Sequence, residues 1–125
     1  LTIDGYPCLN KNEYITTLHQ YIADKKAFIL RDNNITIGIM GFSPNIGSID
    51  FLSIHPQYRH FNITKLFLDK LRNELLYGKK ITLTTYRAGD KADTGYRKEY
   101  CRLGFIESEL LVEYGYPTQR FVLFP

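Results

Sequence analysis

The feature that most constrains the fold is the stretch from Ile49 to Leu71, where an apolar run passes through a short polar turn into an amphipathic pattern. The run to Ile54 has the composition of a strand, and apolar residues recur at helical spacing after the turn. The first amides of a helix have no intrahelical partner and lie at the positive end of its dipole, so this junction suits a phosphate or pyrophosphate. The junction therefore predicts a phosphate-bearing cofactor.

The rest of the chain supplies the other elements of a mixed sheet. Helices are predicted over 13–25, through 66–76 and from Asp90 or Asp93 to Gly104; strands are predicted over 27–31, 35–42, 48–54, 80–86, 105–114 and 120–124. This order predicts an α/β (α+β) fold, with a mixed, mostly antiparallel sheet of about six strands flanked by helices. Only the strands on either side of the 66–76 crossover have to be parallel, and ligands are expected near the carboxyl end of the first of them.

Two finer predictions concern packing and the last turn. The helix after the junction is expected to bury one stripe of apolar side chains: Ile63, Leu66, Phe67, Leu71 and Leu75. A loop over 115–119 is expected to join the last two strands, and it would either line an acceptor pocket or act as an ordinary turn.

Length and composition exclude several classes of protein. The 125 residues, with 44% hydrophobic content, fit a single domain over 1–125 with a sizeable core. The net charge is only +3 and the basic residues are scattered, which argues against nucleic-acid binding. No apolar stretch reaches the roughly 18–20 residues that span a bilayer, and no signal-peptide pattern begins at Leu1, so we expect no membrane partner and a cytoplasmic location.

Cysteine and histidine spacing predicts no metal site. Cys8 and Cys101 are far apart in sequence and are expected to be free thiols in a reducing compartment. His19, His55 and His60 form no pair at the spacing by which one element supplies two metal ligands.

Two local patterns carry a resemblance to a known family. Ile54-His55-Pro56 leads into the segment from Arg59 to Thr64, and the segment from Tyr100 to Phe105 reads Tyr-Cys-Arg-Leu-Gly-Phe. In these patterns the chain resembles the GNAT superfamily of acyl-CoA-dependent N-acetyltransferases over residues 27–125. Their cofactor motif has a Val- or Ile-x-Pro step followed by Arg/Gln-x-x-Gly-x-Gly/Ala, and a later helix ends in Tyr-x-Lys/Arg-x-Gly-Phe.

The chain departs from this family in two places. Asn62 and Thr64 replace both glycines of the phosphate loop. Asn can enter the left-handed backbone region and Thr can offer a hydroxyl to a phosphate oxygen, although a β-branched residue crowds what glycine leaves open. The second departure is a shortened N-terminal region, with one predicted helix before Ala27 where the family has a strand and two helices.

The resemblance implies acetyl-CoA as co-substrate, no metal, and a small-molecule or peptide amine as acceptor. Backbone amides of Leu52, Ser53 and Ile54, above all Ile54, would polarise the thioester carbonyl. The same resemblance places the rest of the cofactor at Arg59, His60, Phe61, Asn62, Ile63, Thr64, Lys65, Asp93 and Tyr96.

Two residues are candidates for proton transfer. By resemblance, Tyr100 would protonate the departing thiolate; the alternative is a packed helix tyrosine. Asp50 is the carboxylate on the central strand and is a candidate base, with an ordinary rim aspartate as the alternative. Three glutamates compete with Asp50 and alternate with apolar residues, so they are expected to share one face of a strand, as an amine site or a solvated face: Glu107, Glu109 and Glu113.

Alternative functions remain open at this stage. The same fold could bind acyl-CoA without turnover, or it could serve as a protein-interaction domain whose phosphate site is not used. A homodimer through the last strands is also an open alternative, because the apolar residues 121–124 are either an exposed contact or part of the core.

Overall fold

The computed structural model describes residues 11–59 and 62–125. The first helix and the strands that follow it are α1 (Lys11–Ala23), β1 (Ala27–Asp32), β2 (Ile35–Ser43) and β3 (Ser48–Ile54). A short 3-10 turn, η1 (Pro56–Tyr58), leads to α2 (Ile63–Glu74) and β4 (Ile81–Tyr86). The chain continues through α3 (Tyr96–Arg102), β5 (Ile106–Glu113) and β6 (Tyr116–Leu123).

The strands form one six-stranded sheet in the order β1-β2-β3-β4-β6-β5. Every neighbouring pair is antiparallel except β3 and β4, which are parallel because α2 crosses between them. The predicted mixed, mostly antiparallel sheet with its single parallel crossover is confirmed.

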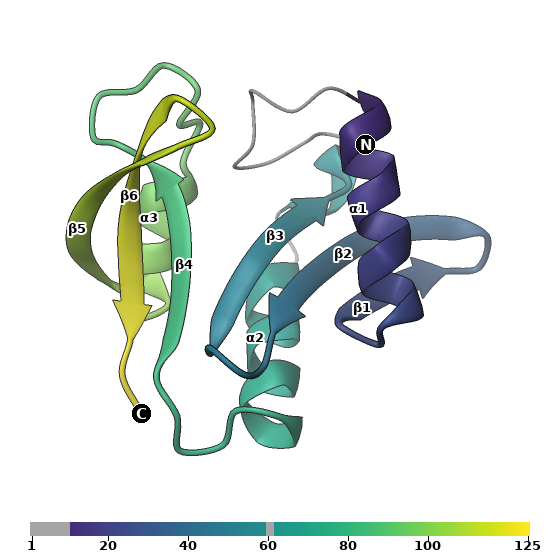
Figure 1. The fold of residues 1–125 in the computed structure, drawn as a ribbon. Coiled ribbons are helices and arrows are strands. Elements are labelled where there is room, and N and C mark those ends of the chain that lie inside the picture. The colour runs from purple at the N-terminus through teal and green to yellow at the C-terminus, as the bar shows by residue number, and fades with distance from the viewer. Residues whose placement is uncertain (1–10, 60–61) are drawn as a thin grey trace.

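The parallel pair β3–β4 separates almost as soon as it forms. Within the described residues, the two strands share one registered pair, Ser48 with Thr82, beside a backbone hydrogen bond of 2.9 Å from the Thr82 amide to the Gly47 carbonyl. Beyond it the strands diverge toward their carboxyl ends (Figure 1). The sheet therefore opens into a wedge, lined by residues 49–52 of β3, residues 83–86 of β4, and Tyr96 and Tyr100 of α3.

Helices cover both faces of the sheet. α2 and α3 lie behind it in Figure 1 and share a core with it that includes Phe42, Phe67, Leu71 and Phe121. α1 lies on the opposite face, where Leu18 packs with Ile39 and Phe51. Within the described part of the chain, no helix has the length and apolar character needed to cross a membrane.

The buried stripe of α2 differs from the predicted one. The buried residues are Ile63, Phe67, Leu68 and Leu71, whereas Leu66 is 53% exposed. Leu75, the C-cap residue, is 41% exposed. Sequence periodicity could not choose between two adjacent faces of this helix, because leucines occur on both, and the position of the sheet decides.

The last connection is shorter than predicted. β6 begins at Tyr116, so the loop expected over 115–119 is a two-residue turn at Tyr114 and Gly115, with φ values of 53° and 75°. Positive φ at both central residues is the geometry that two-residue hairpins favour. Because β6 lies between β4 and β5, Phe121, Val122 and Leu123 are core residues, and Phe124 alone of the 121–124 stretch is exposed.

Candidate active site

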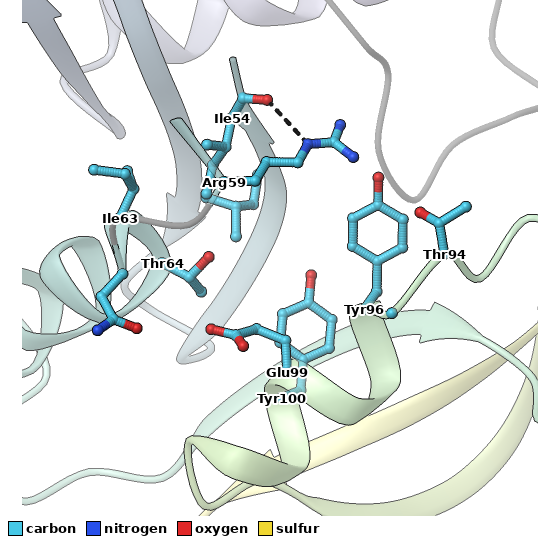
Figure 2. A pocket seen from close by; sticks show the side chains of 11 residues that line it. Ile54, Arg59, Ile63, Thr64, Thr94, Tyr96, Glu99 and Tyr100 are labelled. Carbon is cyan, nitrogen blue, oxygen red and sulfur yellow. Dashed lines mark hydrogen bonds between the residues drawn. The ribbon is translucent and has the colours of Figure 1, made fainter. Parts of the chain in front are cut away.

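A cavity of about 210 Å³ lies where the end of β3, the start of α2 and the start of α3 meet. Both predicted signature segments therefore contribute to one site. The lining residues are Leu52 and Ile54 of β3, Arg59, Asn62, Ile63 and Thr64 around the start of α2, and Thr94, Gly95, Tyr96, Glu99 and Tyr100 around α3. Figure 2 shows Arg59 and Tyr96 reaching toward each other beside the cavity, with Thr64 on the α2 side.

The N-cap side chain of α2 makes no hydrogen bond to the first amides of the helix. Asn62, the N-cap residue, has φ 55° and ψ 36°, in the left-handed region that Asn can enter. Its side chain makes no capping hydrogen bond, and its Oδ1 instead accepts one of 2.9 Å from Arg102 Nη2. The helix therefore begins beside the cavity, and its first amides lack the side-chain acceptor that an N-cap Asn commonly provides.

Arg59 brings positive charge to the same place. Its Nε donates a hydrogen bond of 3.5 Å to the Ile54 carbonyl, and its guanidinium carbon lies 5.9 Å from the centroid of the Tyr96 ring (Figure 2). The side chain therefore spans from β3 toward α3 beside the helix start, where an anion would be attracted by both charge and dipole.

The backbone of Ile54 faces the open side of β3. The His55 amide donates to the Ile37 carbonyl of the neighbouring strand at 2.6 Å. Because backbone groups alternate between the two edges of a strand, the amides of Leu52 and Ile54 are directed away from β2. Ser53 has the opposite orientation; it is 2% exposed, pairs with Ile39 and does not line the cavity.

Tyr96 and Tyr100 are one helical turn apart on α3, and both line the cavity and the wedge. The Tyr100 ring is packed against Phe105 and Phe121, at centroid distances of 6.0 and 6.3 Å. Its packing also follows from how α3 ends: the Phe105 amide donates to the Tyr100 carbonyl at 3.0 Å, across Gly104 with φ 103°. This is a Schellman motif with its hydrophobic contact, so the Tyr-x-x-x-Gly-Phe pattern is a helix stop that fixes the Tyr100 ring.

Asp50 lies in a β-bulge on β3. The register with β2 shifts there, since Phe51 pairs with Gly41 and Ile49 with Phe42, which leaves Asp50 as the extra residue. Its side chain accepts hydrogen bonds from the hydroxyls of Tyr21 (2.6 Å), Ser48 (2.5 Å) and Ser43. Burial, followed by the hydrogen bond to Asp50, raises the pKa of Tyr21 to about 12. Asp50 lines the wedge, but not the cavity at the start of α2.

Of four further predicted side chains, two have other contacts and two lie outside the described residues. Lys65 forms an exposed ion pair of 2.7 Å with Asp69, one turn along α2, and does not line the cavity. Asp93 accepts hydrogen bonds from the Gly95 and Arg97 amides and so caps the start of α3, as its predicted capping role requires. His60 and Phe61 lie outside the described residues.

The three glutamates of β5 do not share a face. A register shift between Glu107 and Leu110 interrupts the alternation of the strand. Glu107 pairs with Arg97 of α3 at 2.5 Å, whereas Glu109 pairs with Arg120 of β6 at 2.6 Å. The predicted acidic face was therefore wrong, because a bulge moved one carboxylate to the helix-covered side.

Sequence reasoning missed Tyr21, Glu99 and Arg102. Tyr21 and Arg102 contribute through contacts between distant segments, such as the hydrogen bond between Arg102 and Asn62, which are 40 positions apart. Glu99 contributes by holding Arg102, one turn along the same helix. The only available signal for Arg102 was its place in the helix-ending pattern. Across the described ranges, no group of three or more His, Cys, Asp or Glu residues is placed to bind a metal.

Comparisons with known proteins support the fold through structure alone. No model of a protein family matches the chain, and no curated protein sequence matches it. Among solved structures, it is similar to a GNAT-family acetyltransferase from Bacillus cereus, with a TM-score of 0.74 and 15% identity over 95% of this chain and 84% of the other. A variant of spermidine N-acetyltransferase from Vibrio cholerae gives a TM-score of 0.60 and 19% identity, covering 90% of this chain and 74% of the other.

The ribosomal-protein-S18-alanine N-acetyltransferase from Escherichia coli matches with a TM-score of 0.62 and 17% identity, over 98% of this chain and 92% of the other. At these identities the likeness concerns the arrangement of the elements. The chain therefore has the fold of the GNAT acetyltransferases, as the two sequence patterns predicted.

Proposed function

We propose that this protein is an acyl-CoA-dependent N-acetyltransferase that moves acetyl from acetyl-CoA to an amine by direct attack. The observation that carries the proposal is one cavity bounded by the end of β3, the uncapped start of α2 and the tyrosine face of α3. The wedge shares Leu52, Tyr96 and Tyr100 with this cavity, so the two are neighbouring parts of one site.

The residues around the cavity suit a diphosphate. The α2 amides would donate to phosphate oxygens at the positive end of the helix dipole, while the Arg59 guanidinium adds charge and the Thr64 hydroxyl a further donor. The left-handed backbone at Asn62 meets the conformational demand that glycine usually meets, and its side chain bonds to Arg102 instead of capping the α2 amides.

The chemistry requires a polarised thioester carbonyl and a stabilised leaving group. The Ile54 amide, directed away from β2, would donate to the carbonyl oxygen as the amine nitrogen attacks its carbon and the carbon–sulfur bond breaks. The Tyr100 hydroxyl would then donate to the thiolate. With reference pKa values of about 10 for Tyr and about 8.5 for a thiol, full proton transfer is uphill by roughly 2 kcal/mol, so hydrogen bonding is its larger contribution.

Asp50 is our candidate for receiving the proton of the amine. It lies on the wall of the wedge, and its carboxylate would also attract an ammonium group before deprotonation. Its three hydroxyl neighbours provide an alternative role, because they make Asp50 the centre of a network that links α1 to β2 and β3. An amine-bearing small molecule or peptide is the proposed acceptor class.

Titration calorimetry with acetyl-CoA, followed by a thiol-release assay on mixed amines, tests the proposal. Binding with amine-dependent thiol release would support it. Binding without release would instead support an acyl-CoA-binding module, and the absence of binding would overturn the proposal in favour of an interaction domain. Arg59→Gln should weaken binding, whereas Arg31→Gln on the edge strand β1, which removes the same charge away from the cavity, should not.

A further inference from the structure

We infer that Arg102 is a positioning residue that holds the Asn62 side chain away from the start of α2, and thereby compensates for the glycine that this turn lacks. The inference rests on the proposed function, because it explains how the site for the coenzyme A diphosphate stays open. It assigns a role to a contact between the end of α3 and the start of α2 that the proposed chemistry does not use.

The first step concerns what Asn62 would do on its own. Asn is among the strongest helix N-cap residues, and its side-chain oxygen normally accepts a hydrogen bond from the second or third amide of the helix. In α2 these amides belong to Thr64 and Lys65. They are the groups that a bound diphosphate needs, so a capping Asn62 would compete with the ligand for the same donors.

The second step is that Arg102 prevents this competition. The Oδ1 atom of Asn62 accepts its hydrogen bond from Arg102 Nη2 at 2.9 Å, and no side-chain cap forms. The backbone of Asn62 is left-handed, whereas a capping residue normally has an extended backbone. Both the side chain and the backbone of Asn62 therefore have a geometry that leaves the α2 amides available.

The third step is that Arg102 is itself held in place. Glu99, one turn earlier on α3, accepts hydrogen bonds from Arg102 Nη2 at 2.7 Å and from Nε at 3.1 Å. The two contacts fix the orientation of the planar guanidinium, which a point-charge ammonium would not achieve. Two of its nitrogens thus contact Glu99 and Asn62, an arrangement that suits positioning rather than direct phosphate binding.

A double-mutant cycle on coenzyme A affinity tests the inference. Arg102→Met should weaken binding of coenzyme A about fivefold, the factor that corresponds to one side-chain cap of about 1 kcal/mol. Asn62→Gly sets the reference affinity for a site without the competing side chain, because glycine adopts φ 55° freely and has no side chain to fold back. Adding Arg102→Met to Asn62→Gly should then cause no further loss.

Two controls separate positioning from charge. Lys98→Met removes a positive charge from the exposed side of the same helix and should leave affinity unchanged. Arg102→Lys keeps the charge but loses the planar fork, so it should resemble Arg102→Met. An equal loss from Arg102→Met in both Asn62 backgrounds would overturn the inference and make Arg102 a direct phosphate contact. No loss of affinity in either background would also overturn the inference, because Arg102 would then have no role in binding.

Amide hydrogen exchange without ligand tests the same inference separately from the proposed function. In Arg102→Met, exchange at Thr64 and Lys65 should slow relative to the wild type, because Asn62 can then adopt the extended backbone of a capping residue and accept hydrogen bonds from these amides. Unchanged exchange at both amides would overturn the inference even where coenzyme A binds. Failure of the wild type to bind coenzyme A would overturn the proposed function alone. The Arg102 side chain is 52% exposed, so its replacement should leave the core intact.

Discussion

At the scale of single residues, Tyr100 meets a structural and a chemical demand at once. The residue is 8% exposed and its ring packs against Phe105 and Phe121, while it lines both the cavity and the wedge. The structural role needs only the ring, and the proposed chemical role needs the hydroxyl. Removing the hydroxyl alone therefore separates the two roles.

Tyr100→Phe should lower kcat at least about tenfold, because the donor to the leaving thiolate is lost. Affinity for acetyl-CoA should stay within about twofold, since the ring packing is retained. Steady-state kinetics and titration calorimetry on the same preparation measure the two quantities. Tyr77→Phe, at a residue that is 84% exposed, is the matched control. An unchanged kcat in Tyr100→Phe would remove this residue from the mechanism.

A second prediction at this scale concerns the pair formed by Asp90 and Tyr116. The Tyr116 hydroxyl donates to Oδ2 of Asp90 at 2.6 Å, and this bond, with one from the Ala92 amide, lowers the pKa of Asp90 below its ordinary 3.8. Because the folded pKa is lower than the unfolded one, the stability gained is complete above the unfolded pKa. It is lost as pH falls through the folded pKa.

Tyr116→Phe should therefore raise the pKa of Asp90 toward its ordinary value, because the first cause of the shift is removed. The difference in unfolding free energy between wild type and variant should be largest near neutral pH and should shrink in acid. NMR titration of the Asp90 carboxyl carbon and urea unfolding at several pH values measure these effects. A pKa that does not move would show that the hydroxyl is not the main cause.

At the scale of elements, the bulge on β3 depends on a small residue on β2. Gly41 pairs with Phe51, and a Cβ added at Gly41 would lie 2.2 Å from Cε1 of the Phe51 ring. The ring therefore covers the glycine and packs with Leu18 of α1 on that face. This contact lies directly beside the bulge at Asp50, so it positions the strand segment that leads to Ile54.

Gly41→Ala should lower the free energy of unfolding by about 1–3 kcal/mol, the usual cost of overpacking a filled site. Combining it with Phe51→Leu should cost less than the sum of the two single changes, because the smaller side chain makes room for the new methyl group. Urea unfolding of the four proteins gives the coupling energy. Strictly additive costs would contradict the contact between this glycine and the aromatic ring.

The elements themselves were largely predictable because their signals are local. The periodicity of β3 and the Gly104-Phe105 stop of α3 read directly from the sequence, and the bounds of β3 were predicted to the residue. The buried face of α2, the start of β6 and the faces of the β5 glutamates were not, because each depends on a partner strand or a bulge.

The residues of the candidate site also fall into those that a local pattern indicates and those that depend on distant contacts. Ile54, Thr64 and Tyr96, which the resemblance names as cofactor contacts, line one cavity because the two motifs that contain them fold locally. The hydroxyl network around Asp50 and the contact between Arg102 and Asn62 join distant segments, and no local pattern encodes them. Side-chain pairs between distant segments therefore could not be predicted from the sequence.

At the scale of the whole molecule, the sheet consists of two halves that meet at the narrow end of the wedge. One half contains β1, β2 and β3, and the other contains β4, β6 and β5. In the described residues they are joined in the sheet by the single registered pair of Ser48 with Thr82, beside the core that both share. The proposed site spans both halves, with Leu52 and Ile54 on one side and Tyr96 and Tyr100 on the other.

A ligand that reaches both sides should couple the two halves, and amide exchange can detect this. Coenzyme A and adenosine diphosphate both carry a diphosphate for the start of α2, but only coenzyme A has an arm long enough to enter the wedge. At about 100 times its own Kd, each ligand stabilises the native state by about 2.7 kcal/mol, so the global effects on exchange cancel in the comparison. The remaining difference should appear in β3 and β4, whose amides coenzyme A alone should protect by holding the two strands together.

Hydrogen exchange measured by mass spectrometry on the two complexes gives this difference, with β1 as an internal reference on the far edge of the sheet. Equal protection of β3 and β4 by both ligands would show that the arm does not bridge the wedge, and the acetyl group would then have to react elsewhere.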